Sequence, residues 1–276
     1  MLCAPADRTD IHITNGKISK INWLLNVIAS FLLFCCSYLL SIKADLFDRP
    51  IVRFVNRFTN INYTVDNFLF ALDNYPTFGG VILLCFVWYV LSNLNNTYLK
   101  ARVIIAVLSA STAGLISRFL QHTLQTHPRP FYDTALKFNI PSVHSQAPLN
   151  TWHSYPSDHA VVLFGLTLAV YIGNRKLGLK LAIWISLVEF ARIYVGAHYP
   201  TDIIGGGALA LCLVWFSQNH TFVLLSLKFG KVLKISKGSW YAISFFLSYQ
   251  IATLFSDIRS IISFNALTTA ISSYFN

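Results

Sequence analysis

The ionisable residues that lie inside or at the edge of apolar stretches gather in three short segments of the chain. The segments are 118–130, 155–159 and 189–202, and together they hold arginines, histidines, a serine and aspartates. An arginine guanidinium matches the oxygens of a phosphate, and a histidine can serve as nucleophile or general acid near neutral pH. His198 and Asp202 are four residues apart, close enough for the carboxylate to orient the imidazole ring. These residue types predict phosphoryl transfer through a phosphohistidine intermediate.

The composition indicates that these segments belong to a membrane protein. The chain has 276 residues, of which 55% are hydrophobic and 12% are charged, against about 25% charged residues in globular domains. That excludes a soluble enzyme with a water-facing shell, and the apolar content excludes a disordered chain. A helix needs about 20 apolar residues to cross a bilayer. Stretches that reach or approach this length are Asn22–Ile42, Phe78–Leu94, Val103–Leu120, His159–Ile172, Leu181–Ala197 and Asp202–Phe216.

We therefore expect an all-α, polytopic membrane protein with a six-helix transmembrane core. The core would span residues 22–217, with the motifs at 122–202, after a cytoplasmic N-terminal segment at 1–21. Residues 218–276 would add a basic loop and an additional C-terminal membrane helix. The stretches that could provide this helix are Trp240–Phe255 and, as the weaker candidate, Ile261–Phe275. Because consecutive spans alternate in direction, the three polar segments are expected on one face, opposite the N-terminus.

The basic residues suggest which way the protein faces. Lys and Arg number 21 against 11 Asp and Glu, a net charge of +10, which in a soluble protein would suggest a nucleic-acid partner. In a membrane protein, Lys and Arg collect instead in cytoplasmic loops. With the N-terminus inside, twelve of the 21 lie on the inner side. We therefore expect a multi-pass protein of the plasma (inner) membrane, with no nucleic-acid partner, a cytoplasmic N-terminus and the polar segments at the extracytoplasmic face.

A second basic pattern follows the first apolar stretch. Arg49, Arg53 and Arg57 recur every four residues with apolar residues between them, which is typical of a helix that lies in the membrane interface. Such a helix could recruit anionic lipids, or it could be a plain interfacial connector. The connector is the favoured interpretation.

The three polar segments resemble the signature of the type 2 phosphatidic acid phosphatase superfamily. That signature reads Lys-x6-Arg-Pro, then Pro-Ser-Gly-His, then Ser-Arg-x5-His-x3-Asp. The corresponding segments here are His122-x6-Arg129-Pro130, Pro156-Ser157-Asp158-His159 and Ala191-Arg192-x5-His198-x3-Asp202. The motifs occur in the family's order and spacing at the ends of the expected spans, and they cover less than a third of the chain.

The resemblance implies a role for each matching residue. His198 would attack phosphorus while Asp202 orients it, and His159 would protonate the leaving oxygen and then activate water. The residues implied in binding the phosphate are Arg129, Arg192, Ser157, His122 and Asp158. Because arginines can stabilise the transferring phosphoryl group by charge alone, we expect no metal and no other cofactor.

Three positions depart from the family pattern. His122 replaces the family lysine, and Arg118, one turn earlier, could supply the missing charge. Ala191 replaces a serine, and Asp158 replaces a glycine. The carboxylate of Asp158 is unfavourable beside a phosphate unless it faces a basic group. Asp158 also makes the second motif similar to the bacterial undecaprenyl-diphosphate phosphatase branch. Segments that share this similarity are His127-Pro128-Arg129-Pro130-Phe131 and Phe190-Ala191-Arg192-Ile193-Tyr194.

One acidic residue lies inside an expected span. Glu189 is the only glutamate of the chain and precedes Arg192 by about one helical turn. We expect it to pair with and orient that arginine. A role in relaying protons is the alternative.

The resemblance implies an integral-membrane lipid phosphatase that hydrolyses a polyprenyl (undecaprenyl) diphosphate to the monophosphate and inorganic phosphate. One alternative is a phosphatase or phosphotransferase of the same family that acts on phosphatidic acid, phosphatidylglycerol phosphate or lipid A. Another is a transporter or scaffold without enzymatic activity, whose charges line a pathway. The lipid, the choice between water and a second lipid as acceptor, the oligomeric state and the purpose of the C-terminal extension stay open at this point.

Overall fold

The structure, a computed structural model, describes residues 20–124, 126–143, 153–232 and 236–256, and these residues contain helices and no strand. The apolar runs of the sequence become the long helices. The helices, in chain order, are α1 (Lys20–Ile42), α2 (Asp48–Asn56), α3 (Tyr63–Asn74), α4 (Ile82–Asn93), α5 (Thr97–Thr123), α6 (Asp158–Gly173), α7 (Arg175–Tyr194), α8 (Pro200–Ser217), α9 (His220–Val232) and α10 (Lys237–Ala252). A short π-helix, η2 (Thr77–Val81), leads into α4, and a 3-10 turn, η3 (Pro130–Tyr132), follows Arg129.

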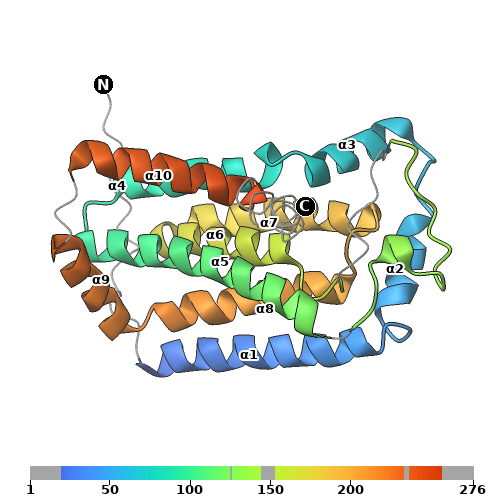
Figure 1. The fold of residues 1–276 in the computed structure, drawn as a ribbon, viewed down its shortest axis with the longest axis horizontal. Coiled ribbons are helices and arrows are strands. Elements are labelled where there is room, and N and C mark those ends of the chain that lie inside the picture. Colours follow the sequence, from blue (N-terminus) through green and yellow to red (C-terminus); the bar gives the residue numbers. More distant parts are fainter. Residues whose placement is uncertain (1–19, 125, 144–152, 233–235, 257–276) are drawn as a thin grey trace, which may run out of the picture.

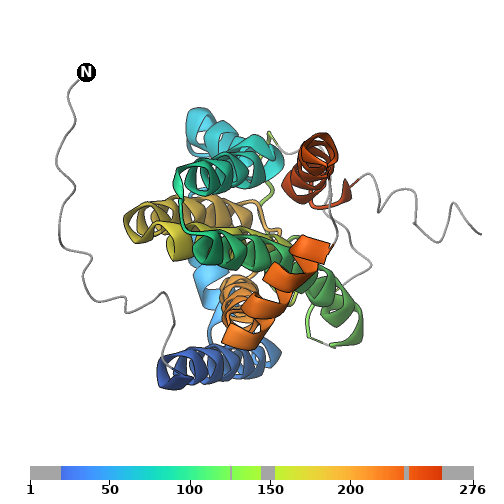
Figure 2. The same cartoon turned by 90° about the vertical axis from the view of Figure 1, so that its left-hand side faces the viewer.

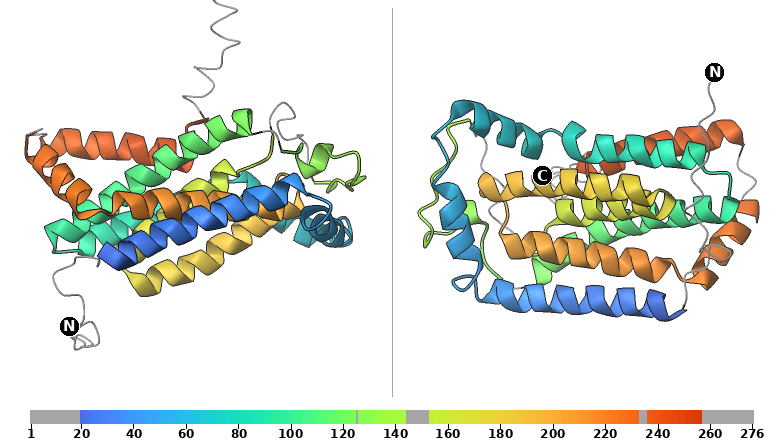
Figure 3. Two further views of the ribbon diagram at one scale, coloured as in Figure 1. Left: turned by 90° about the horizontal axis from the view of Figure 1, so that it is seen from below. Right: turned by 180° about the vertical axis from the view of Figure 1, so that it is seen from behind.

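The long helices lie side by side along the long axis of the molecule (Figure 1). Helix α6 packs against α4, α5, α7 and α8 and so lies at the centre of the bundle, as the end-on view of Figure 2 also shows. Helix α1 packs along α8 in both views of Figure 3. Helix α2 lies at the end of the bundle where α6 and α8 begin, and α9 lies at the opposite end (Figure 1).

Close contact between α6 and α8 brings the starts of these two helices together. A Cβ atom on Gly206 would lie 2.6 Å from the backbone oxygen of Ser157, so only a residue without a side chain allows this approach. The backbone N–H of Ser157 donates to the backbone oxygen of Asp202 over 3.0 Å. The second and third motifs are therefore joined directly through the backbone.

The helix boundaries can be compared with the expected spans. Each of the six expected apolar stretches overlaps a helix: α1, α4, α5, α6, α7 and α8. Among the described residues, α1, α5 and α8 are long and apolar enough to cross a bilayer, and α3 with the helix Thr77–Asn93 is a possible fourth span, bent by 68°. Helix α6 is apolar but has 16 residues. The chain is thus a multi-pass membrane protein, and the six-helix core stays a prediction.

The segments outside that core also form helices. Helix α10 overlaps the expected helix Trp240–Phe255, whereas α3 and α9 were not expected as helices of their own. The polar segment 1–19 and the amphipathic candidate Ile261–Phe275 lie outside the described residues.

Candidate active site

The three motifs meet at the end of the bundle where α6 and α8 begin. His198 lies in the turn between α7 and α8, Arg129 lies in the loop after α5, and both are buried. Asp202 is in the first turn of α8, Ser157 caps α6, and Arg192 is in the last turn of α7. Residues from separate parts of the sequence are thereby brought together around His198, as the alternation of helix directions predicts.

His198 is held between an arginine and a carboxylate. Arg129 Nη1 lies 2.9 Å from His198 Nε2, and Asp202 Oδ2 lies 3.3 Å from His198 Nδ1. Since a guanidinium can only donate hydrogen bonds, Nε2 must accept and Nδ1 must carry the ring proton toward Asp202. Burial, followed by the positive charges of Arg129 and Arg192, holds the pKa of His198 well below its usual range. The imidazole is therefore neutral, with its lone pair on Nε2.

Asp202 is fixed by the start of its own helix. The backbone N–H of Tyr199 donates to Asp202 Oδ2 over 2.8 Å, which ties the carboxylate to the helix N-terminus. The next residue, Thr201, donates its backbone N–H to Oδ1 of Asp48 over 3.0 Å and its hydroxyl to Oδ2 over 2.5 Å. Asp48 belongs to α2, so the end helix of the bundle anchors the residues that orient His198.

A second histidine lies beside a buried ion pair. Arg118 Nη2 is 2.7 Å from Asp158 Oδ2, and His159 Nδ1 is 3.2 Å from Asp158 Oδ1. Asp158, the departure from the family glycine, therefore faces two basic groups. His159 also lines a cavity of about 90 Å³ together with Arg192 and Asp73, and its side chain is 32% exposed. It is thus the more accessible of the two histidines.

Both arginines near His198 keep one N–H group without a protein acceptor. Arg129 Nη1 donates to the Ala197 backbone oxygen over 2.9 Å as well as to His198, and Arg192 Nη1 donates to Asp73 over 2.8 Å. The Nε atoms of both arginines are buried and have no hydrogen-bond partner among the described residues. An unmade hydrogen bond from a buried charged group is costly, so these N–H groups are suited to an anion.

Ser157 combines two functions. Its hydroxyl oxygen accepts from the backbone N–H of Ala160 over 3.3 Å and so caps α6. The side chain is fully buried, and its hydroxyl proton remains available to a ligand, since a cap uses only the lone pairs. The N-terminus of α6 adds its partial positive charge.

The structure places His122 differently from the other predicted site residues. It is exposed near the C-terminal end of α5, whereas its neighbour Gln121 is buried and donates to the Pro156 backbone oxygen over 2.6 Å. Arg118, one turn earlier on the same helix, is the cation that the structure places against the second motif.

Glu189 also differs from expectation. Arg192 pairs with Asp73 of α3 instead, and neither carboxylate oxygen of Glu189 has a hydrogen-bond partner among the described residues. The sequence offered no signal for Asp73 or Asp48, which lie on α3 and α2 outside every motif. Both were isolated acidic residues at unremarkable spacings.

The arginines after the first span are used within the protein. Arg49 pairs with Asp45 and Asp133, both at 2.8 Å, and Arg53 donates to the Ala135 backbone oxygen over 3.2 Å. Helix α2 is therefore tied to the loop after Arg129, which agrees with a connector. In the described part of the chain, no group of three or more His, Cys, Asp or Glu side chains could hold a metal ion.

Comparison with known proteins relates the segment that holds the three motifs to a known family. Residues 102–223 match the family model of the PAP2 superfamily. Undecaprenyl-diphosphatase BcrC of Bacillus subtilis is 28% identical over 163 residues, which are 59% of this chain and 78% of the relative. Lipid A 1-phosphatase of Rhizobium johnstonii is 28% identical over 133 residues, 46% of this chain and 49% of that relative.

One solved structure aligns with most of this chain. It is the crystal structure of a transmembrane PAP2 type phosphatidylglycerolphosphate phosphatase from Bacillus subtilis, 16% identical, with a TM-score of 0.49 over 77% of this chain and 98% of that one. The family match covers the segment that contains all three motifs. Residues 102–223 therefore match a PAP2 superfamily domain, and this match, with the undecaprenyl-diphosphatase and lipid phosphatase relatives, supports a phosphatase hydrolase.

Proposed function

We propose that this phosphatase hydrolyses a polyprenyl diphosphate, with undecaprenyl diphosphate as the type substrate, to the monophosphate and inorganic phosphate. The observation that carries the chemistry is the arrangement of His198 between Arg129 and Asp202. It presents a neutral imidazole with its lone pair toward the buried guanidinium of Arg129. That is the arrangement a phosphohistidine mechanism requires.

In the first step, the terminal phosphoryl group binds to the arginines and the lone pair of His198 Nε2 attacks its phosphorus. The Nη1–H group of Arg129, which donates to Nε2 in the structure, donates to a phosphoryl oxygen instead, and the lone pair of Nε2 becomes free. The bond from phosphorus to the bridging oxygen breaks, and His159 donates a proton to that oxygen as the lipid monophosphate leaves. Asp202 stabilises the Nδ1–H of the phosphorylated ring.

In the second step, water attacks the phosphorus of phosphohistidine while His159 accepts one of its protons. The bond between phosphorus and Nε2 breaks, the lone pair returns to Nε2, and inorganic phosphate leaves. The Nε–H groups of Arg129 and Arg192, with the Ser157 hydroxyl, would hold the equatorial oxygens in both steps. His122, exposed on α5, and Asp158, paired with Arg118, would act outside this inner set.

The choice of a diphosphate is supported by the relatives named as undecaprenyl-diphosphatases and by Asp158 in the second motif. Relatives named as lipid A 1-phosphatase and phosphatidylglycerophosphatase B support a second candidate, hydrolysis of a lipid phosphomonoester. A phosphotransferase would use the same first step and pass the phosphoryl group to a second lipid.

We further propose that the N-terminus is cytoplasmic and the site faces the extracytoplasmic side of the plasma membrane. The charge distribution supports this orientation. Residues 22–217 would form the phosphatase core, after the segment 1–21, and residues 218–276 would form an extension that includes α10.

The test is phosphate release from undecaprenyl diphosphate, phosphatidic acid, phosphatidylglycerol phosphate and lipid A by the purified full-length protein, with and without a chelator. We expect the highest kcat/KM on the diphosphate and no effect of the chelator. His198→Ala should abolish release, whereas His220→Ala, at the start of α9 at the opposite end of the bundle, should not. A higher kcat/KM on a monoester would favour the second candidate, and phosphate recovered on an added acceptor lipid would indicate a transferase. If the protein released phosphate from none of these lipids, a transporter or scaffold would be supported.

A further inference from the structure

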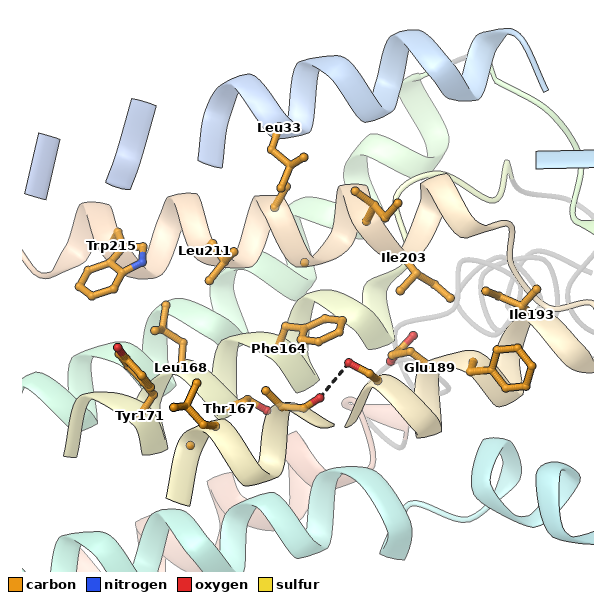
Figure 4. A pocket seen from close by; sticks show the side chains of 18 residues that line it. Leu33, Phe164, Thr167, Leu168, Tyr171, Glu189, Ile193, Ile203, Leu211 and Trp215 are labelled. Atoms are coloured by element: carbon orange, nitrogen blue, oxygen red, sulfur yellow. Dashed lines mark hydrogen bonds between the residues drawn. The ribbon is translucent and has the colours of Figure 1, made fainter. Parts of the chain in front are cut away.

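An apolar groove of about 720 Å³ lies between α1, α6, α7 and α8 (Figure 4). It shares no lining residue with the cavity that contains His159 and Arg192. Residues from each of the four helices line it: Leu33, Phe164, Ala182, Ile203, Leu211 and Trp215. The groove is therefore separate from the proposed phosphate site.

The groove is open toward the surface that a membrane would cover. Leu33, Leu179 and Ile204 line it and are 45%, 53% and 40% exposed. From Ile203 to Trp215, its wall on α8 is about 18 Å long at 1.5 Å per residue, close to the roughly 15 Å of one leaflet of a 30 Å hydrocarbon core. An apolar groove of this length in a bilayer is filled by hydrocarbon, because water does not solvate it.

One carboxyl group lies in this apolar wall. Glu189 is 1% exposed, and both of its oxygens lack a hydrogen-bond partner among the described residues. Figure 4 shows the side chain at the groove, near Ile203. The hydroxyls of Thr167 and Ser186 donate to backbone oxygens of their own helices, each over 2.8 Å. A buried polar group without a partner is costly, so Glu189 indicates a ligand with a polar atom at this depth.

We propose that the groove binds a diacyl glycerophospholipid, with one acyl chain along α8 and an ester carbonyl at the carboxyl group of Glu189. Glu189 lies five residues before the end of α7, about 7.5 Å along the helix axis, which is the depth of the ester groups below a lipid headgroup. A carboxyl group in its protonated form donates one hydrogen bond, and an ester carbonyl accepts one. A polyprenyl chain has no polar atom below its phosphates and matches this wall less well.

This site can be tested without turnover, by titrating the purified full-length protein with phosphatidylglycerol and following bound lipid by native mass spectrometry. Two forms with equal chains are compared, a diester and a diether, since the diether lacks the carbonyl. We expect the wild-type chain to bind one diester molecule about five- to tenfold more tightly than the diether, the range that one hydrogen bond supplies. Glu189→Leu should bind both forms equally.

Two further variants separate the groove from the rest of the membrane surface. Ser186→Phe places a ring in the groove and should abolish binding of both the diester and the diether lipid. Ile183 lies on the same helix, is 76% exposed and does not line the groove, so Ile183→Phe should leave the binding of both lipids unchanged. Phosphate release should be retained in Ser186→Phe. An unchanged diester preference in Glu189→Leu would overturn the assignment of Glu189. Loss of undecaprenyl monophosphate binding in Ser186→Phe would show that the groove holds the substrate's own tail and overturn the proposal.

Discussion

Arg129 donates from Nη1 to Nε2 of His198 over 2.9 Å, so the proposed nucleophilic nitrogen has its lone pair covered in the structure without substrate. The Nε–H of the same guanidinium is buried and has no hydrogen-bond partner among the described residues. A phosphoryl oxygen that takes over the Nη1 hydrogen bond would bind and expose the nucleophile in one event. Substrate binding and nucleophile activation would then be coupled through a single side chain.

The first prediction concerns the acid side of the pH profile. Burial is the main cause that lowers the pKa of His198, and the charges of Arg129 and Arg192 lower it further. The imidazole therefore stays unprotonated at pH values below the ordinary histidine pKa of about 6.5. Removing one positive charge in Arg129→Gln should raise that pKa. The acid limb of kcat/KM against pH should then move to higher pH, in addition to a loss of rate.

Arg129→Lys is the matched control, because it keeps the charge and loses the planar fork. Its rate should fall while its acid limb stays near that of the wild-type chain. Identical midpoints in the Gln and Lys variants would contradict an electrostatic role for Arg129 on His198.

The second prediction concerns His159 as the general acid. A lipid monophosphate leaves as a stable anion, whereas the alcohol of phosphatidic acid needs a proton in the transition state. His159→Ala should therefore lower the rate on phosphatidic acid by about 10²- to 10⁴-fold and the rate of phosphoenzyme formation from the diphosphate by less. Single-turnover rates with both lipids measure the difference. An equal loss on both would show that His159 does not protonate the leaving oxygen.

The long apolar helices could be predicted from sequence because long apolar runs have few alternatives in a bilayer. The convergence of His198, His159 and Arg129 followed from the alternation of helix directions. The bend between α3 and α4 could not be predicted from the sequence. Pro76 and the glycines of η2 lie at the bend, but neither residue type specifies an angle.

The partners of the site residues were harder to predict. Asp73 and Asp48 reach the site from α3 and α2, and no spacing within the chain relates them to Arg192 or Thr201. Glu189 was expected to pair with Arg192, but the two side chains lie on neighbouring faces of α7. Arg192 faces Asp73 and the cavity with His159, while Glu189 faces the groove beside α8.

The third prediction concerns the ion pair of Arg118 and Asp158, whose side chains are 19% and 7% exposed. Removing either partner takes a charge of opposite sign away from a largely buried charged group, so Arg118→Gln and Asp158→Asn should each destabilise the chain. The free energy of unfolding of the double variant should fall by less than the sum of the losses in the two single variants, with a coupling free energy of about 0.5–3 kcal/mol. Thermal unfolding in detergent measures all three.

His122→Gln is the control on the same helix, because His122 is exposed, and its effect should stay within about 0.5 kcal/mol. Additive effects of the two single variants would mean that the ion pair contributes nothing. If His122→Gln lowered stability as much as Arg118→Gln, the assignment of Arg118 in place of the family lysine would be wrong.

The fourth prediction concerns the buried loop histidine beside the anchor of α8. His127 Nε2 lies 3.7 Å from Asp48 Oδ2, its Nδ1 lies 2.9 Å from the Ser154 hydroxyl, and its ring packs at 4.3 Å on Tyr199. Burial opposes its protonation, but the nearby carboxylate of Asp48 and the charge of Asp202 outweigh burial and raise the pKa of His127.

A group whose pKa is higher in the folded state adds stability below its unfolded pKa of about 6.5, and that stability is lost as pH rises through the folded pKa. The melting temperature of the wild-type chain should therefore fall between pH 6 and pH 8, by about 2–4 °C for each 1 kcal/mol lost. His127→Gln should be less stable at pH 6 and show a flatter profile over the same range. If the melting temperature of His127→Gln fell with pH as steeply as that of the wild-type chain, a group other than His127 would be responsible for the pH dependence.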